Sequence, residues 1–228
     1  GGEAATGQRA IDEIIVTANK REESIQDVPI AISAFGNAIL SDRGISDLND
    51  LKIFSPSLSV GEGVGGNTYL QIRGIGNDAI ATGADPAVAV HLDGVYFSTQ
   101  NYFDASFFDI ERVEVLRGPQ GTVYGRNATG GSINVVTNGP SEEFDAHASA
   151  VFGDYNLIET EAAIGGALLD EKLLGRLAIF MSKRDGYTPS LVSGQDLDDM
   201  DRSAGRLKIK YILSDDADVV ISANYARD

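Results

Sequence analysis

The chain has 228 residues, of which 43% are hydrophobic and 23% are charged, so it is long and apolar enough for one sizeable folded domain and an appendage. Its 34 acidic and 18 basic residues give a formal net charge of −16, which argues against a nucleic-acid partner because phosphates would be repelled over most of the surface. The lack of cysteine excludes disulfide scaffolds, thiolate metal sites and cysteine nucleophiles.

The N-terminal residues predict a flexible tail that carries one short β-prone segment. Residues 1–10 are small and polar without periodicity, and the segment IDEIIVTA follows at Ile11–Ala18. A polar stretch over residues 19–27 separates this segment from everything downstream. Such an isolated segment can add a strand to the open sheet edge of another protein. The alternative, which the residues leave open, is an ordinary first strand of the following domain.

The stretch from Val28 to Thr137 predicts a compact α+β domain with short elements. Ser46 is the expected N-cap of a short helix, which ends before Pro56. Glycine clusters mark turns or close backbone approaches at 61–66, 74–76, 118–125 and 130–131. The strand candidates between them are Ile30–Ala34, Leu58–Val60, Tyr69–Ile72, Val88–Leu92, Val113–Leu116 and Ile133–Val136.

After Gly139 and Pro140 the pattern changes to long segments in which apolar and polar residues alternate. No apolar run reaches the ~18–20 residues of a membrane-spanning helix, so any membrane crossing has to use β-strands. The connections 169–172 and 214–217 are short and 187–202 is long, as in an outer-membrane barrel, whereas a soluble β-sandwich favours strands of ~5–6 residues. The five alternating segments are Phe144–Phe152, Ile158–Leu168, Leu173–Arg184, Gly205–Leu213 and Val219–Tyr225.

Five blocks of the sequence resemble, in order, the conserved segments of one family. EIIVTA at 13–18 resembles a TonB box, and QDVPIAISAF at 26–35 resembles the start of a plug domain. LQIRGIG at 70–76 and VAVHLDGVYF at 88–97 resemble internal plug motifs. The most specific block is DIERVEVLRGPQGTVYGRNATGGSINVVT at 109–137, which resembles the end of the plug. The chain therefore resembles a TonB-dependent outer-membrane receptor.

This resemblance implies an α+β plug domain followed by antiparallel β-strands of an incomplete transmembrane β-barrel. The implied division is a flexible tail with the TonB box at 1–21, the plug at 22–140, and the first five or so barrel strands at 141–228. The family's TonB-binding residues fall on Glu13, Ile14, Ile15, Val16, Thr17 and Ala18. Two arginines are implied to contact the barrel, and these are Arg73 and Arg117. The structural motif of the plug falls on Gly74, Gly118, Pro119, Tyr124, Gly125, Gly130 and Gly131.

Within the last block, the alternation of RVEVL predicts a strand with one apolar face and one polar face. Val113 and Val115 are expected to point into the core, whereas Arg112 and Glu114 are expected to face a polar surround. The sharp turn at Gly118-Pro119 follows from the freedom of glycine and the fixed φ of proline.

The function that the resemblance implies is active uptake of a scarce substrate such as a siderophore, cobalamin or carbohydrate, driven by the proton gradient. The implied partners are TonB in the periplasm, outer-membrane lipid and a small-molecule substrate of unknown identity, and the implied location is the outer membrane of a Gram-negative bacterium. Five strands cannot close a plugged barrel of 22 strands, so we expect this chain to be an N-terminal fragment. The alternative function is a free-standing periplasmic plug-like binding module.

Several sequence patterns invite sharper interpretations that we reject. Gly61, Gly63 and Gly66 form a GxGxxG pattern, but a strand rather than a helix is expected after it, which disfavours a nucleotide site. His91 and His147 are isolated along the sequence and are expected to be structural. The acidic loop at 187–201 lacks the glycine and distal glutamate of an EF-hand, and the sequon at 127–129 is better explained as a turn. We expect no enzyme activity, cofactor or metal site.

Overall fold

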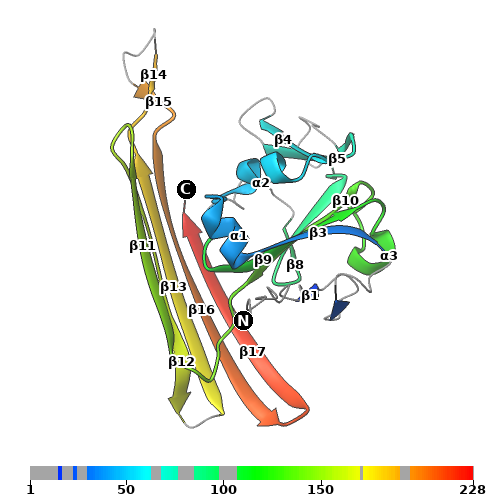
Figure 1. The fold of residues 1–228 in the computed structure, drawn as a ribbon, viewed down its shortest axis with the longest axis vertical. Helices are drawn as coiled ribbons and strands as arrows, with labels where there is room; N and C mark the ends of the chain where they lie inside the picture. The colour runs from blue at the N-terminus through cyan, green and yellow to red at the C-terminus, as the bar shows by residue number, and fades with distance from the viewer. Residues whose placement is uncertain are drawn as a thin grey trace, which may run out of the picture.

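The computed structural model describes residues 15–16, 23–24, 30–62, 68–76, 85–97, 107–169, 172–190 and 196–227. The described residues up to Thr137 form an α+β domain, here called the plug, and the tall antiparallel sheet beside it is here called the wall (Figure 1). The plug strands are β1 (Ile15–Val16), β2 (Glu23–Ser24), β3 (Ala31–Gly36), β4 (Leu58–Glu62), β5 (Thr68–Ile72), β6 (Ile75–Gly76), β7 (Val88–Leu92), β8 (Val95–Phe97), β9 (Ile110–Arg117) and β10 (Gly131–Thr137), and its helices are α1 (Asn37–Asp42), α2 (Leu48–Phe54) and α3 (Gly121–Tyr124).

The plug is built on a five-stranded sheet in the order β3-β9-β10-β7-β8. The β7–β10 pair is parallel, and the other pairs in this sheet are antiparallel. One face of this sheet packs against α1, α2 and the small β4-β5-β6 sheet to form the main hydrophobic core (Figure 1). Val113, Ile133 and Val90 lie at its centre and are fully buried, which confirms the inward face predicted for β9. The predicted strand at Val88–Leu92 has the observed bounds, since glycine and proline turns flank it.

Helix α2 begins one residue later than expected, because Asp47 and not Ser46 is its N-cap. The Asp47 carboxylate accepts a hydrogen bond from the backbone N–H of Asp50 at 2.8 Å. The Asp50 carboxylate accepts one in return from the backbone N–H of Ser46 at 2.9 Å, so two free donors at the helix start are satisfied reciprocally. Burial raises the pKa of the Asp47 carboxyl above its ordinary value, and the bond from Asp50 opposes this rise.

The wall is a five-stranded antiparallel sheet in chain order, as its alternating segments predict. From Arg176 to Lys183 along β13 the burial alternates: Leu177 and Ile179 point outward and are half exposed, whereas the Arg176 side chain on the inner face is buried. Among the described residues, no helix is both long and apolar enough to cross a lipid bilayer. The wall strands are β11 (Asp145–Gly153), β12 (Leu157–Leu169), β13 (Leu173–Arg184), β16 (Met200–Ser214) and β17 (Ala217–Arg227).

The long acidic connection between β13 and β16 contains a small hairpin, formed by β14 (Thr188–Pro189) and β15 (Asp196–Leu197). This hairpin lies beyond one end of the wall, and the short β16–β17 turn lies at the other end (Figure 1). The predicted contrast between long and short connections is therefore present. Residues 191–195 of this loop lie outside the described part of the chain.

Candidate functional site: the docked β1 strand and the plug–wall interface

The predicted TonB box is described at Ile15 and Val16, which form strand β1. These residues pair antiparallel with β2 in the register Ile15–Ser24 and Val16–Glu23. The Val16 side chain is fully buried and packs against Leu116, with Tyr124 among the partly buried neighbours. The expectation that this segment lacks a partner in its own chain is therefore wrong for Ile15 and Val16. Two β-branched residues favour a strand, and a nearby apolar surface gives it a place to dock.

The other TonB-box positions lie outside the described residues, as does the predicted flexible tail through residue 14. These positions are Glu13, Ile14, Thr17 and Ala18.

Tyr124, at the end of α3, lies between docked β1 and a chain of buried polar groups. Its hydroxyl accepts a hydrogen bond from Asn134 Nδ2 at 2.7 Å, and its ring contacts the His91 ring with 5.1 Å between centroids. Burial raises the pKa of the Tyr124 phenol to about 12; the negative charge of Glu114 adds to this rise and the bond from Asn134 opposes it. The phenol is therefore neutral over the physiological pH range.

The polar chain continues across three strands of the plug sheet. Ser132 Oγ donates to Asn134 Oδ1 at 2.9 Å and lies 3.1 Å from His91 Nδ1. Asn134 Nδ2 also donates to Glu114 Oε2 at 3.3 Å, and Arg112 Nε donates to Glu114 Oε1 at 2.9 Å. His91 is therefore part of this buried network of polar side chains, which agrees with the structural role predicted for it.

Arg112 and Glu114 face polar groups, as predicted, but these groups are buried, since Glu114 is fully buried and Arg112 is 8% exposed. Both faces of β9 are covered, one by the core and one by the side where β1 and α3 lie. The side chains satisfy each other, because a buried carboxylate and guanidinium have to be paired.

The two predicted barrel-contacting arginines lie in different places within the plug. Arg73 is exposed in the turn between β5 and β6, where its φ of 53° is left-handed. Arg117 ends β9 and donates to the backbone carbonyls of Ala31 (3.4 Å) and Ile32 (3.3 Å), both on β3. Their contact with a barrel stays a prediction, and the observed role of Arg117 is to hold the edge strand β3.

The predicted structural motif of the plug forms the turns around β9 and β10. Gly118 (φ 97°) starts the turn that Pro119 continues, and Gly125 (φ 78°) ends α3. Gly74 (φ 76°) lies in the β5–β6 turn. Gly130 lies so close to the next layer that a Cβ would come within 2.7 Å of the Ile75 carbonyl oxygen. A glycine is therefore needed there because of space.

Gly131 is required both for its backbone conformation and for lack of space: its φ is 148°, and a Cβ would lie 2.2 Å from the Leu116 carbonyl oxygen. Gly131→Ala is expected to destabilise the plug by roughly 2–4 kcal/mol, because backbone strain and overpacking each cost about 1–3 kcal/mol. Hydrogen exchange of the β9 and β10 amides measures this loss. Gly139→Ala is the matched control, because a Cβ at Gly139 meets nothing within 4 Å. Equal exchange in the two variants would contradict the steric argument.

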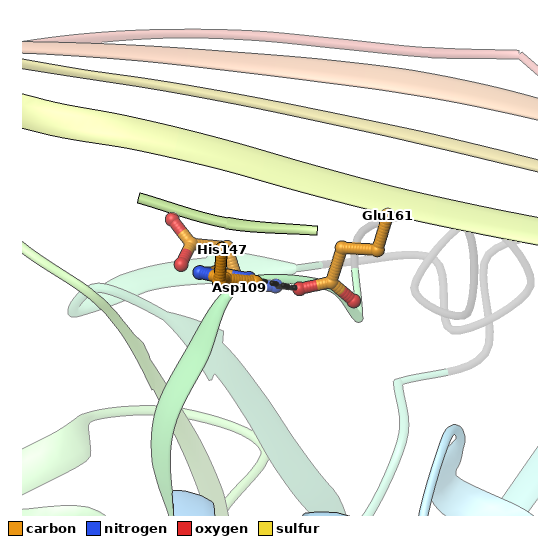
Figure 2. Close-up of side chains that lie close together, drawn as sticks. All are labelled: Asp109, His147 and Glu161. Carbon is orange, nitrogen blue, oxygen red and sulfur yellow. Dashed lines mark hydrogen bonds and ion pairs between the residues drawn. The ribbon is translucent and has the colours of Figure 1, made fainter. Parts of the chain in front are cut away.

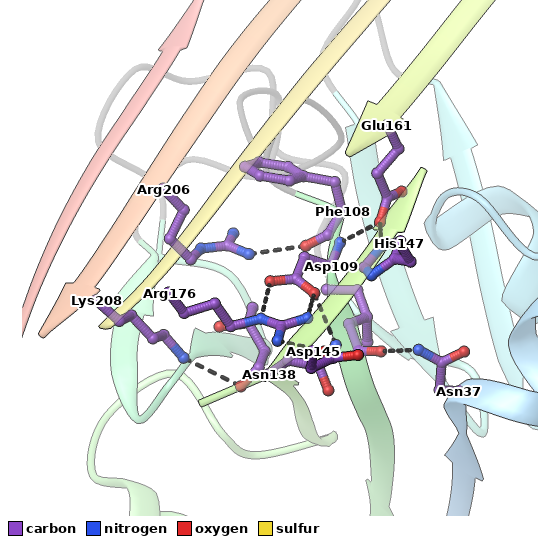
Figure 3. A network of polar contacts seen from close by, with 12 residues as sticks. Asn37, Phe108, Asp109, Asn138, Asp145, His147, Glu161, Arg176, Arg206 and Lys208 are labelled. Atoms are coloured by element: carbon purple, nitrogen blue, oxygen red, sulfur yellow. Dashed lines mark hydrogen bonds and ion pairs between the residues drawn. The ribbon is translucent and has the colours of Figure 1, made fainter. Parts of the chain in front are cut away.

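Three buried cations on the inner face of the wall, here called the wall cations, bind the plug: Arg176 on β13, and Arg206 and Lys208 on β16 (Figure 3). Arg176 makes a bidentate pair with the Asp109 carboxylate, at 2.8 Å from Nε and 2.6 Å from Nη2. Its Nη1 also donates to Asp145 on the wall at 2.7 Å.

The other two wall cations donate to main-chain carbonyls of the plug. Arg206 Nη1 donates to the Phe108 carbonyl at 2.7 Å, and its guanidinium lies 4.3 Å from the centre of the Phe108 ring. Lys208 Nζ donates to the Thr137 carbonyl at 3.0 Å and lies 3.0 Å from Asp93 Oδ2. The interface also contains an apolar contact, because the Phe108 ring stacks on the Phe180 ring of the wall. Arg206 and Lys208 share one face of their strand in the alternating sequence, but the sequence does not indicate that the plug is their partner, and Arg176 carries no such signal.

Asp109, His147 and Glu161 bring three potential metal-ligand atoms within 4.8 Å of one another (Figure 2). His147 Nε2 lies 3.1 Å from Glu161 Oε1, which also accepts a bond from the Asp109 backbone N–H, so the fold gives this histidine an acidic partner that lies 14 residues away in the sequence. Both Asp109 oxygens already accept bonds from Arg176, and one also accepts from Asn138. The guanidinium supplies the charge that a metal would supply, so we interpret the cluster as a plug–wall contact.

The glycine-rich pattern that begins at Gly61 and the sequon that begins at Asn127 both lie in ordinary structural elements where the structure describes them. Gly61 lies in β4, which pairs antiparallel with β5, so the glycine-rich pattern does not open a βαβ unit. Asn127 occupies a left-handed turn (φ 68°) and donates to the Tyr96 hydroxyl at 2.7 Å, as expected for turn chemistry.

Comparisons with known proteins agree with this architecture. Residues 24–132 match the model of the TonB-dependent Receptor Plug Domain. The pesticin receptor of Yersinia pestis is 28% identical over 214 residues, covering 93% of this chain and 32% of that protein. The crystal structure of the ferric yersiniabactin uptake receptor from Yersinia pestis superposes with a TM-score of 0.72 at 25% identity, covering 86% of this chain and 31% of that one. The pyoverdine outer-membrane receptor of Pseudomonas aeruginosa shares the fold, with a TM-score of 0.75 at 18% identity.

An α+β plug packed on the inner face of an antiparallel wall is the architecture that the chain shares with these receptors. Residues 24–132 match the plug domain of TonB-dependent receptors, and the chain as a whole is similar to such receptors. It spans about a third of the length of the pesticin receptor and of the ferric yersiniabactin uptake receptor.

Proposed function

We propose that the chain is the front part of an outer-membrane receptor of a Gram-negative bacterium, which takes up a scarce substrate with energy from the proton gradient. In this proposal residues 1–21 carry the TonB box, 22–140 plug the barrel, and 141–228 are its first strands. The observation that carries the proposal is the set of wall cations bound to plug carbonyls and to Asp109 across the interface.

TonB is the proposed periplasmic partner, and it binds the β1 region by adding a strand. In the described part of the N-terminal segment, β1 pairs with the two residues of β2, and burial of Val16 holds it further. Backbone donors and acceptors of such a short strand are available to a competing sheet edge once it undocks. The event that starts transport is then the release of Val16 from Leu116 and Tyr124.

A ferric siderophore is the substrate class that we propose. The proteins to which the chain is similar include receptors named for ferric yersiniabactin and for pyoverdine, which are siderophore systems. The particular ligand is set by parts of the receptor beyond the described wall and plug, because extracellular loops and the remaining strands enclose the outer face.

The alternative function, a free-standing periplasmic plug-like module, is disfavoured by the outer face of the wall. Leu177, Ile179 and Met181 follow one another on the outside of β13 and are about half exposed. Neighbouring strands extend this apolar surface with Leu207 and Ile221. An apolar face of this size needs lipid or a partner, and lipid-facing strands provide the simplest account.

Uptake of radioiron tests the proposal. The receptor is expressed in a strain that lacks its own siderophore receptors, with and without TonB, and is supplied with ferric yersiniabactin or ferric pyoverdine as probes. We expect binding of one probe in both strains and uptake only where TonB is present, with the receptor in the outer-membrane fraction. Equal uptake without TonB, or recovery of the protein from the periplasm without detergent, would contradict the proposal.

A further inference from the structure

The surface on which β1 docks, here called the dock, is built by separate parts of the plug. Val16 and Leu116 form its buried centre, and the partly buried Tyr124 packs against them from α3. Leu116 belongs to β9, so the central sheet fixes its place. Tyr124 lies outside that sheet and needs another means of support. The remaining dock residues are Ile30, Ile32 and Ala34, which lie on β3 or directly before it.

Helix α3 provides little of that support by itself. It has four residues, and its N-cap Gln120 makes no side-chain capping bond. The backbone N–H groups of Val123 and Tyr124 both donate to the Gln120 carbonyl, at 3.1 and 2.9 Å. A helix of one turn is not stable alone, because its nucleation costs more than its few bonds return. The position of the Tyr124 ring therefore depends on the bond that its side chain makes.

Asn134 on β10 makes that bond from the centre of the buried polar network. Its Nδ2 group has two hydrogens and faces two acceptors, Tyr124 Oη at 2.7 Å and Glu114 Oε2 at 3.3 Å. Its Oδ1 accepts the hydroxyl hydrogen of Ser132 at 2.9 Å. Asn134 is 5% exposed, so these bonds replace the bonds to water that burial removes.

The network permits one orientation of the Asn134 amide. The Glu114 carboxylate can only accept, so it has to face Nδ2 rather than Oδ1. Ser132 then donates its single hydroxyl hydrogen to Oδ1, and His91 Nδ1, 3.1 Å from the same hydroxyl, has to donate. Flipping the amide would bring Oδ1 against the carboxylate and bury two acceptors face to face. The network therefore holds Nδ2, and with it the Tyr124 phenol, in one place.

We propose that Asn134 is a positioning residue for the dock: by holding the Tyr124 phenol it keeps the ring against the centre of the dock, and it thereby sets how often β1 is released. The inference rests on the proposed function for the identity of the partner, since TonB is the protein that would capture released β1. Loss of the Asn134–Tyr124 bond then increases the released fraction of β1 without opening the plug sheet.

A thiol reporter in the complete receptor measures release of β1 directly, and the chain helps because it contains no cysteine. Cysteines elsewhere in the receptor are replaced by serine. Val16→Cys places a thiol at a fully buried position, so a maleimide reacts with it when β1 is released. Val90→Cys is the second reporter, because it is equally buried in the main core and reacts when the sheet opens. Each reporter is combined with Tyr124→Phe, which keeps the ring and removes the accepting oxygen, and with Asn134→Ala.

We expect Tyr124→Phe to raise the reaction rate of the thiol at position 16 by about three- to tenfold, the range that follows from one net hydrogen bond, and to leave the rate at position 90 within about twofold. Tyr96→Phe is the matched control, because Tyr96 also accepts a 2.7 Å bond from an asparagine, Asn127, and is not one of the dock residues. Both rates are expected to stay unchanged in it. Tyr124→Phe added to Asn134→Ala is expected to release β1 no further than Asn134→Ala alone, because both changes remove one bond.

An unchanged rate at position 16 in Tyr124→Phe would overturn the inference. An equal rise at position 90 would overturn it too, because it would show general loosening of the plug. Tyr124→Phe keeps the test decisive if Asn134→Ala does not fold. Neither rate requires TonB or a substrate, so the two proposals fail separately: if release follows the Asn134–Tyr124 bond while TonB-dependent uptake is absent, the proposed function fails and the role of Asn134 in docking stands.

Discussion

Val16→Pro is expected to abolish TonB-dependent uptake while the affinity of the receptor for its probe stays unchanged. Proline removes the backbone N–H and fixes φ near −65°, so the segment can no longer form a complete added strand. In the proposed receptor the substrate binds at the outer face, so its affinity is not expected to depend on this backbone N–H. Radioiron uptake and equilibrium binding to the same cells measure the two properties separately.

Val16→Ala is the matched control, because it keeps every backbone donor and acceptor. It removes two methyl groups from the contact with Leu116, which weakens docking by roughly 1–3 kcal/mol. We expect this variant to keep most of its uptake, and to expose β1 to protease more often than the wild type. Wild-type uptake by the proline variant would refute the assignment of the TonB box at residues 13–18.

Glu114→Ala is expected to destabilise the plug sheet by about 1–3 kcal/mol, since the buried Arg112 guanidinium loses its fully buried carboxylate partner and keeps the half-exposed Glu111. Asn134 Nδ2 also loses one acceptor, although it keeps its bond to the Tyr124 hydroxyl. Hydrogen exchange of the β9 and β10 amides in the purified receptor gives the free energy of local opening.

The double variant Arg112→Met with Glu114→Leu separates two free energies: the net contribution of the charge pair to stability, and the loss of stability when one partner alone is removed. Replacing both partners of a buried pair by apolar side chains is often neutral, so we expect the double variant to recover most of the lost stability. A double variant that opens as readily as Glu114→Ala would show that the pair contributes through more than mutual neutralisation.

The local pattern of the sequence was sufficient to predict most elements. Five wall strands were predictable because apolar and polar residues alternate over long segments, and Val88–Leu92 was predictable because turns bound it on both sides. The cap of α2 was misplaced by one residue, since Ser46 and Asp47 both have capping side chains and the choice depends on how the chain enters the helix.

The contacts that make up the site depend on pairing between distant parts of the chain. Arg176 meets Asp109 across 67 residues, and Arg206 meets Phe108 across 98. Nothing local to these residues indicates which partner neutralises them. The same holds for His147 beside Glu161, and for Val16, whose burial depends on a surface that β9 and α3 build together.

The alternation of the wall also constrains how it can be assembled. Arg176 lies opposite Lys208, and Ala178 lies opposite Arg206, so both strands direct their charges inward in the observed register. Sliding β16 by one residue would turn Arg206 and Lys208 toward acyl chains and bring Leu207 inside. Each cation near the bilayer midplane would cost about 2–4 kcal/mol. The register that places the wall cations against the plug is therefore also the register that keeps their charges off the apolar outer face.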